Sequence, residues 1–174
     1  MADYELGGVV RTRSGSVLPG VAPSNVYPTA DGSEVIIAGN ADSVFARLCE
    51  AMDRPDLAVD ERYATHGARG ANAAALDELI DAWTSTLSSD DLLDLLAGLG
   101  VPSGRVYTAA DALRDPHYAA RGMVQRLTSV GGVSMPVAGV VPTFSRTPGS
   151  IRTPGPALGA DSDELLGHDV QVDS

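Results

Sequence analysis

The segment VIIAGNADSVFARLCEAM, residues 35–52, contains a change of hydrophobic period that decides the fold class. Its first four residues follow an Asp31-Gly32 turn, and they predict a strand, apolar throughout and buried, that pairs with residues 26–29 in a hairpin. Residues 39–42 form a turn, after which apolar side chains recur at helical spacing. These side chains are Val44, Phe45, Leu48, Cys49 and Met52. A hairpin that leads directly into an amphipathic helix indicates a domain in which helices and strands are mixed.

The rest of the chain extends this pattern in both directions. Residues 56–70 read as an irregular polar connection, and residues 139 onward show no strong periodicity. Between them we expect helices at 71–86, 88–99, 109–114 and 115–122, a short strand at 105–107, and a hairpin of 123–128 with 133–136. The helices and strands lie in separate clusters, which is typical of an α+β fold. The prediction is therefore a small α+β domain over residues 26–138, with extended arms over 1–25 and 139–174.

Composition excludes several classes of function. The 174 residues carry a net charge of −11, so phosphate backbones and anionic lipid surfaces are disfavoured as partners. All 12 basic residues are arginine, which excludes Schiff-base chemistry by a lysine of this chain. No apolar run reaches the ~20 residues of a membrane span, and the first residues show no signal-peptide pattern. One cysteine forms no internal disulfide, so the expected location is the reducing cytoplasm.

Five short segments occur in the order and at about the spacing found in one protein family. They are PGVAPSNVYPTADG (19–32), AGNAD with FARLC (38–49), GVPSGRVYT (100–108), DPH with ARGM (115–123), and TPG with GPALG (147–159). Together they cover nearly the whole chain. The sequence therefore resembles the C-terminal portion, mainly the small domain, of the class III CoA-transferases, also known as the CaiB/BaiF or formyl-CoA transferase-like family.

The resemblance implies a function and a set of partners. Members of this family move CoA from an acyl-CoA to a carboxylic acid, and an aspartate of a Rossmann-like large domain attacks the thioester. By resemblance, residues 1–25 are a linker arm from that large domain, and residues 139–174 return toward it. The nucleophilic aspartate is then expected before Met1, so the isolated chain is predicted to be inactive. No permanently bound cofactor is expected. The predicted partners are the large domain, the two substrates and a second copy in a homo-oligomer.

Two alternatives stay open beside CoA transfer. An acyl-CoA racemase of the same family would move an α-proton instead of CoA. A His and Asp pair in the large domain would favour racemisation, whereas a lone nucleophilic Asp would favour transfer. The second alternative is an interaction module without catalysis.

The resemblance also suggests five site residues. Gly15 and Gly20 lie where relatives carry a glycine-rich loop that covers the reacting carbonyl, although an ordinary interdomain linker would have the same composition. Arg11 and Arg13 are the basic residues next to this loop and are candidates for binding CoA. Asp42 matches an acidic position near the active site of the racemase branch, and it also stands where a carboxylate would cap a helix.

Other chemically capable residues are assigned structural roles. His66, His117 and His168 have no metal-ligand spacing, so no metal site is predicted. Cys49 and Trp83 are expected in the core. Ser103 lacks a Gly-x-Ser-x-Gly elbow, which excludes a hydrolase interpretation.

Overall fold

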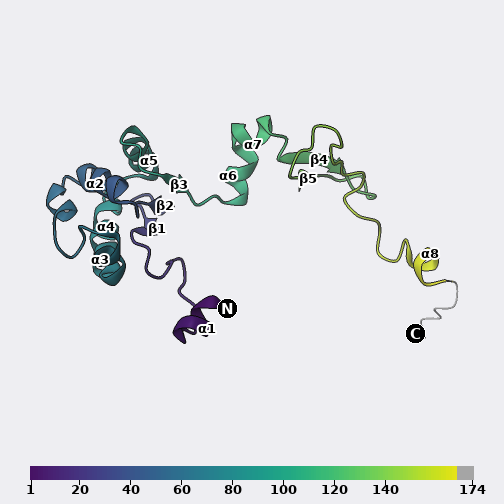
Figure 1. Cartoon of the computed structure of the whole chain (residues 1–174). Helices are drawn as coiled ribbons and strands as arrows, with labels where there is room; N and C mark the ends of the chain where they lie inside the picture. Colours follow the sequence, from purple (N-terminus) through teal and green to yellow (C-terminus); the bar gives the residue numbers. More distant parts are fainter. Residues whose placement is uncertain (168–174) are drawn as a thin grey trace. The chain divides into compact units, whose positions relative to one another are not determined.

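The computed structural model describes residues 1–167 and divides the chain into two compact units, Met1–Val106 and Tyr107–Ser174 (Figure 1). Unit 1 contains α1 (Ala2–Gly7), β1 (Ser24–Pro28), β2 (Glu34–Ala38), α2 (Asp42–Ala51), the 3-10 turn η1 (Pro55–Ala58), α3 (His66–Ala71), α4 (Ala73–Thr84), α5 (Ser89–Gly98) and β3 (Ser103–Arg105). Unit 2 contains α6 (Ala109–Arg114), α7 (Pro116–Ala120), β4 (Val124–Thr128), β5 (Ser134–Ala138) and α8 (Ser162–Leu166). The fold is α+β with extended arms, as predicted.

The sheet of unit 1 is antiparallel in the order β1-β2-β3. Val26 pairs with Ile36, and Ile36 pairs with Gly104 on the other side. Val35 and Ile37 are buried on one face, whereas Ile36 is 46% exposed. The expectation of a strand buried throughout was wrong at Ile36, because alternate residues of a strand point to opposite faces and helices cover one face only.

Helices α4 and α5 pack against this sheet, and α2 packs against α5. Their apolar stripes close one core, in which Cys49 is buried and Trp83 is partly buried, as predicted. Each Leu, Ile or Phe side chain taken from water contributes about 1.5–3 kcal/mol. The largest apolar side chains that are fully buried are Tyr27, Tyr63, Phe45, Ile37, Leu48, Leu57, Leu76, Ile80, Leu92 and Leu96.

The hairpin turn and the start of α5 are tied together by one carboxylate. Asp31 accepts hydrogen bonds from the hydroxyl of Thr29 and from the backbone N–H of Ser33, which closes the turn. Its second oxygen accepts from the N–H and the hydroxyl of Ser89, the first residue of α5. These donors stabilise the ionised form and hold the pKa of Asp31 well below its ordinary value of 3.8.

Residues 53–72 are more regular than the sequence indicated. The predicted polar connection contains η1 and α3, and the predicted helix 71–86 corresponds to α4 alone. Thr65 explains the start of α3, since its side chain accepts a hydrogen bond from the N–H of Ala68. The short strand predicted at 105–107 lies at Ser103–Arg105.

Unit 2 is built from local structure. Thr108 and Asp111 form a capping box at α6, and Asp115 caps α7 with Pro116 at its first position. β4 and β5 pair in an antiparallel hairpin. No residue between 107 and 167 is buried, and residues 139–161 contain no helix or strand. The division between the units at residues 106 and 107 does not coincide with either predicted domain boundary, at 25 or at 138.

Candidate functional site

The two predicted loop glycines lie on the arm that enters unit 1. Both have left-handed backbones, with φ of 66° at Gly15 and 78° at Gly20, a region that glycine adopts without a steric penalty. Gly20 lies against α3, because a Cβ atom at Gly70 would be 2.7 Å from the Gly20 carbonyl oxygen. No neighbouring atom lies within 4 Å of a Cβ position at Gly15 or at Gly20 itself. The two glycines differ because the Gly20 carbonyl lies against Gly70, whereas Gly15 lies in an exposed turn closed by the N–H of Val17 and the carbonyl of Ser14.

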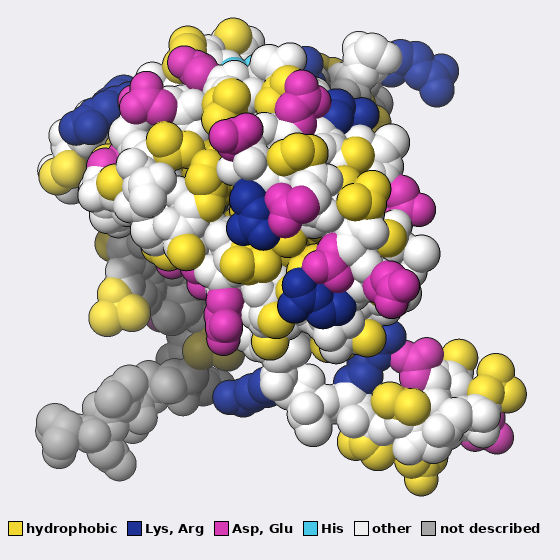
Figure 2. Space-filling view, turned by 90° about the vertical axis from the view of Figure 1, so that its left-hand side faces the viewer, with side chains coloured by type: hydrophobic (Ala, Val, Ile, Leu, Met, Phe, Trp, Pro, Cys, Tyr) yellow, Lys and Arg dark blue, Asp and Glu magenta, His cyan; other side chains and the backbone are white. Residues whose placement is uncertain are grey.

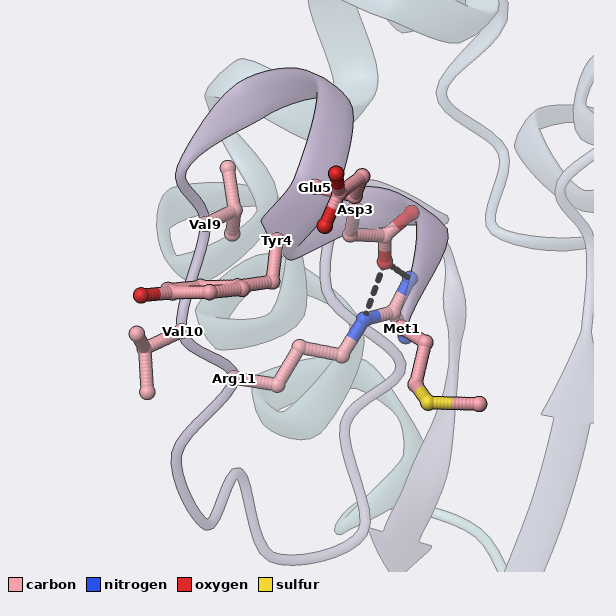
Figure 3. A pocket seen from close by; sticks show the side chains of 7 residues that line it. All are labelled: Met1, Asp3, Tyr4, Glu5, Val9, Val10 and Arg11. Carbon is pink, nitrogen blue, oxygen red and sulfur yellow. Dashed lines mark hydrogen bonds and ion pairs between the residues drawn. The ribbon is translucent and has the colours of Figure 1, made fainter.

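The predicted CoA-binding arginines are also on the arm. Arg11 binds Asp3 through its Nε and Nη2 atoms, at 2.7 and 2.6 Å from the same carboxylate oxygen. Both residues line a hollow of about 490 Å³ beside α1, and in Figure 3 the Tyr4 ring extends between the side chains of Val9 and Val10. Arg13 is exposed and has no ion-pair partner in the described part of the chain. The Asp3 pair is exposed, so it contributes only about 0–1 kcal/mol and leaves Arg11 available to a phosphate.

The rest of the surface drawn in Figure 2 offers no basic patch. Acidic and basic side chains alternate there, with apolar side chains between them. Arg54 binds Asp56 and Arg62 binds Asp60 on exposed loops of unit 1. In each pair the two charges neutralise each other. The hydrogen bond from Arg62 lowers the pKa of Asp60 to about 2. Arg11 and Arg13 are thus exposed basic groups on the arm, and Arg114, Arg121, Arg126, Arg146 and Arg152 of unit 2 are exposed as well.

Asp42 does not cap α2. It is the first residue of the helix, Ala41 is the N-cap, and no side chain accepts a cap hydrogen bond there. The expectation of a cap was wrong because the carboxylate has a stronger partner. Its Oδ1 lies 2.6 Å from Nη2 of Arg69, and 68% of the Asp42 side chain is exposed.

Arg69 is the centre of this region, and its side chain is 0% exposed. Its Nε donates to the carbonyl of Ala22 at 3.1 Å, and its Nη1 donates to that of Tyr63 at 2.9 Å. The Nη2 atom donates to the carbonyl of Asn40 at 2.8 Å as well as to Asp42. The guanidinium also lies 4.7 Å from the centre of the Phe45 ring. A buried cation is tolerated when it is paired and hydrogen-bonded, and this one is paired with Asp42 and donates from all three of its nitrogens.

We call Arg69, Asp42, Asn40 and His66 the Arg69 cluster. His66 begins α3, and its Nδ1 is 3.2 Å from the carbonyl oxygen of Asn40. The cluster joins the arm, the end of β2, the start of α2 and α3. Only Asp42 and His66 are exposed, so an external group can reach a carboxylate and an imidazole here but not the guanidinium.

A second polar chain attaches the arm to α4. The hydroxyl of Ser16 donates to Asn25 at 2.6 Å, and the amide of Asn25 donates to Asp77 at 3.0 Å. The other oxygen of Asp77 accepts from the buried hydroxyl of Tyr27 at 2.6 Å. Burial first, and the hydrogen bond to Asp77 second, raise the pKa of Tyr27 far above its ordinary value. Tyr27 is therefore a fixed donor and not an acid or base.

The other candidates have structural positions. Burial raises the pKa of the Cys49 thiol to about 11, which makes it unreactive. His117 lies in the first turn of α7, Ser103 lies in β3, and His168 falls outside the described residues. Within residues 1–167, no three His, Cys, Asp or Glu side chains gather to hold a metal ion. In the same part of the chain, no helix has the length and apolar character needed to cross a membrane.

Known proteins resemble this chain over nearly its whole length. The sequence model of CoA-transferase family III matches residues 1–162, which include the arm, the rest of unit 1 and most of unit 2. The chain belongs to CoA-transferase family III. It is 47% identical over 164 residues to succinyl-CoA–D-citramalate CoA-transferase of Chloroflexus aurantiacus, which covers 94% of this chain and 41% of that protein. It is 38% identical to succinyl-CoA:mesaconate CoA-transferase of Haloarcula hispanica, again covering 94% of this chain and 40% of the relative.

A solved structure gives the same result for the fold. A CaiB/BaiF family protein from Brucella suis superposes with a TM-score of 0.72 at 34% identity, covering 94% of this chain and 42% of that one. The family III chain thus spans about two fifths of the length of the relatives that it matches. It corresponds to a small domain within a larger fold.

Sequence reasoning missed Arg69 and Asp77. Arg69 stands in HGARGA, residues 66–71, where small neighbours leave room for a guanidinium close to the backbone. That local pattern was the available signal. The buried role of Arg69 could not be inferred from this pattern, because its side chain binds carbonyl groups 6, 29 and 47 residues away in sequence, which lie together only in the folded chain.

Proposed function

We propose that this chain is the small-domain part of a CoA-transferase that moves CoA from succinyl-CoA to a second dicarboxylic acid. The observation that carries the proposal is the 47% identity, over nearly the whole chain, to succinyl-CoA–D-citramalate CoA-transferase. Relatives named for L-malate, mesaconate and glutarate support the same substrate class. In each of these names succinate or its CoA ester is one partner and another dicarboxylic acid is the second.

The proposed reaction uses covalent catalysis. An aspartate in the part of the relatives that this chain does not match attacks the thioester carbonyl, and the CoA thiolate leaves as a mixed anhydride forms. A carboxylate is a weak nucleophile, so the division into steps lowers each barrier. CoA is a substrate in this scheme, and no permanent cofactor takes part. The contribution of the small domain is to place the arm, with Arg11 and Arg13, beside that site and to present Asp42 from the start of α2.

The test combines the chain with the segment that it lacks relative to its homologue. The remaining part of the Chloroflexus aurantiacus protein would be joined to or coexpressed with this chain, since 47% identity preserves most contacts. We expect the combination to convert succinyl-CoA and D-citramalate into succinate and citramalyl-CoA, measured by chromatography of the CoA esters. The chain alone should show no turnover, and acetate should replace D-citramalate poorly.

The same assay separates the two alternative functions. Racemisation would appear as uptake of deuterium at the α-carbon of a 2-methylacyl-CoA, without transfer of CoA. An interaction module would restore neither reaction. Transfer by the chain alone would contradict the proposed division between the two segments.

Assembly and location remain proposals of the same kind. We expect a homodimer, because unit 2 carries exposed apolar side chains such as Val130 and Phe144 and has no buried residue among 107–167. The boundaries of the small domain at 26–138 are likewise a proposal for the whole enzyme. A cytoplasmic location rests on the single cysteine and on the metabolic relatives.

A further inference from the structure

Helix α3 touches the arm at two consecutive residues. Arg69 donates to the carbonyl of Ala22, and Gly70 lies so close to Gly20 that a Cβ atom would meet its carbonyl oxygen at 2.7 Å. The first contact is a hydrogen bond from a buried cation, and the second is a direct approach of two backbones. Both fix the same short segment, residues 20–22.

Further contacts hold the arm on either side of that segment. The N–H of Gly39 donates to the carbonyl of Pro23 at 2.9 Å, which ties the arm to the end of β2. On the other side, Ser16 is held through Asn25 to Asp77 of α4. Residues 16–23 are thus attached to the sheet and helices of unit 1, whereas Gly15 lies in an exposed turn before the first of these contacts.

We propose that Arg69 and Gly70 are positioning residues, which set the path of the arm so that it bends at Gly15 and not at Gly20. The inference rests on the proposed function for its effect on catalysis. In this proposal Gly15 is the hinge of the suggested covering loop, and Gly20 is its fixed point. Residues before Gly15, including Arg11 and Arg13, can then change position relative to residues 16–23, which stay with the sheet and helices of unit 1.

The first test uses two glycines of the same helix. Gly70→Ala introduces a methyl group that forces Gly20 away, whereas Gly67→Ala meets nothing within 4 Å. Both substitutions favour helix formation equally, so α3 itself is not weakened. Hydrogen exchange of the full chain would be followed at the amide of Gly39, which reports the bond to Pro23, and at the core amides of Leu48 and Ile80.

We expect Gly70→Ala to raise exchange at Gly39 about tenfold while the core amides keep their rates, and Gly67→Ala to change neither. Arg69→Lys, which cannot reproduce the guanidinium fork, should raise exchange at Gly39 in the same direction. Equal behaviour of the two alanine variants would overturn the proposal. So would faster exchange of Leu48 and Ile80 in Gly70→Ala, since the contact would then support the core and not the arm.

A second readout addresses catalysis in the combined enzyme. Gly70→Ala should lower kcat about tenfold or more, with the KM for succinyl-CoA and the melting temperature equal to those of Gly67→Ala. An unchanged kcat would refute the positioning role in the reaction. If the combined enzyme transfers no CoA at all, the proposed function fails, and the exchange measurements still decide whether α3 sets the path of the arm.

Discussion

Replacement of Arg69 by Met tests the energetic account of the Arg69 cluster. Methionine keeps much of the side-chain volume over Phe45 but donates no hydrogen bond. The carbonyl groups of Ala22, Tyr63 and Asn40 each lose a donor, at about 1–3 kcal/mol for a buried group. Removal of the buried cation offsets part of this loss in the free energy of unfolding, because the desolvation penalty of the cation disappears. We expect the free energy of unfolding of unit 1 to fall by about 3–5 kcal/mol.

Urea unfolding followed by tryptophan fluorescence measures this change, because Trp83 is the single tryptophan and packs against the core of unit 1. Arg62→Met is the matched control. Its side chain is 63% exposed and its ion pair with Asp60 contributes about 0–1 kcal/mol. A loss below about 1 kcal/mol in Arg69→Met, or one equal to the control, would refute the reasoning from burial.

Four further outcomes are expected. Cys49 should resist a disulfide reagent at pH 8 until the chain unfolds, and fast labelling of the folded chain would contradict its burial. Because its folded pKa of about 11 exceeds the ordinary 9.0, the free energy of unfolding should fall as the pH rises above 9. The hydrogen bonds to Asp31 lower its pKa, so their contribution to the free energy of unfolding should be complete above pH 3.8 and be lost on further acidification. Asp31→Asn should lose less of this free energy over the same acid titration. Tyr27→Phe should cost about 1–2 kcal/mol in urea unfolding, whereas the exposed Tyr4→Phe should cost nothing. Light scattering should detect a dimer, more strongly in high salt where the charge of −11 is screened, and a monomer in both high and low salt would exclude it.

The parts of the fold that depend on short-range chemistry could be predicted from the sequence. The Asp31-Gly32 hairpin and the short helices expected from residues 109 and 115 are all where local patterns place them. Each involves residues within a few positions of one another, so propensity and hydrogen bonding act together. The core stripe of α2 was predicted for the same reason, since helical periodicity alone selects Phe45, Leu48 and Cys49.

The parts that failed depend on distant groups. Asp42 was expected to cap a helix, because a local donor is the only partner that sequence can show. In the structure a guanidinium 27 residues away competes successfully for that carboxylate. Residues 56–70 were expected to be irregular, and the buried contacts of Arg69 stabilise helix α3 there although it has two glycines. The family was recognised from motifs, but no motif indicated that Gly20 is fixed by Gly70.

The position of the buried residues has a consequence for the synthesis of the protein. Among residues 1–167 the last buried side chain is Val101, and the N–H of Val106 donates to the carbonyl of Glu34 at the end of the first sheet. Every group needed for the core of unit 1 is therefore synthesised before residues 107–174. The later residues gain no burial of their own between 107 and 167, so their order of folding depends on the arrival of a partner surface. During translation, the core of unit 1 can therefore form before the residues of unit 2 are complete.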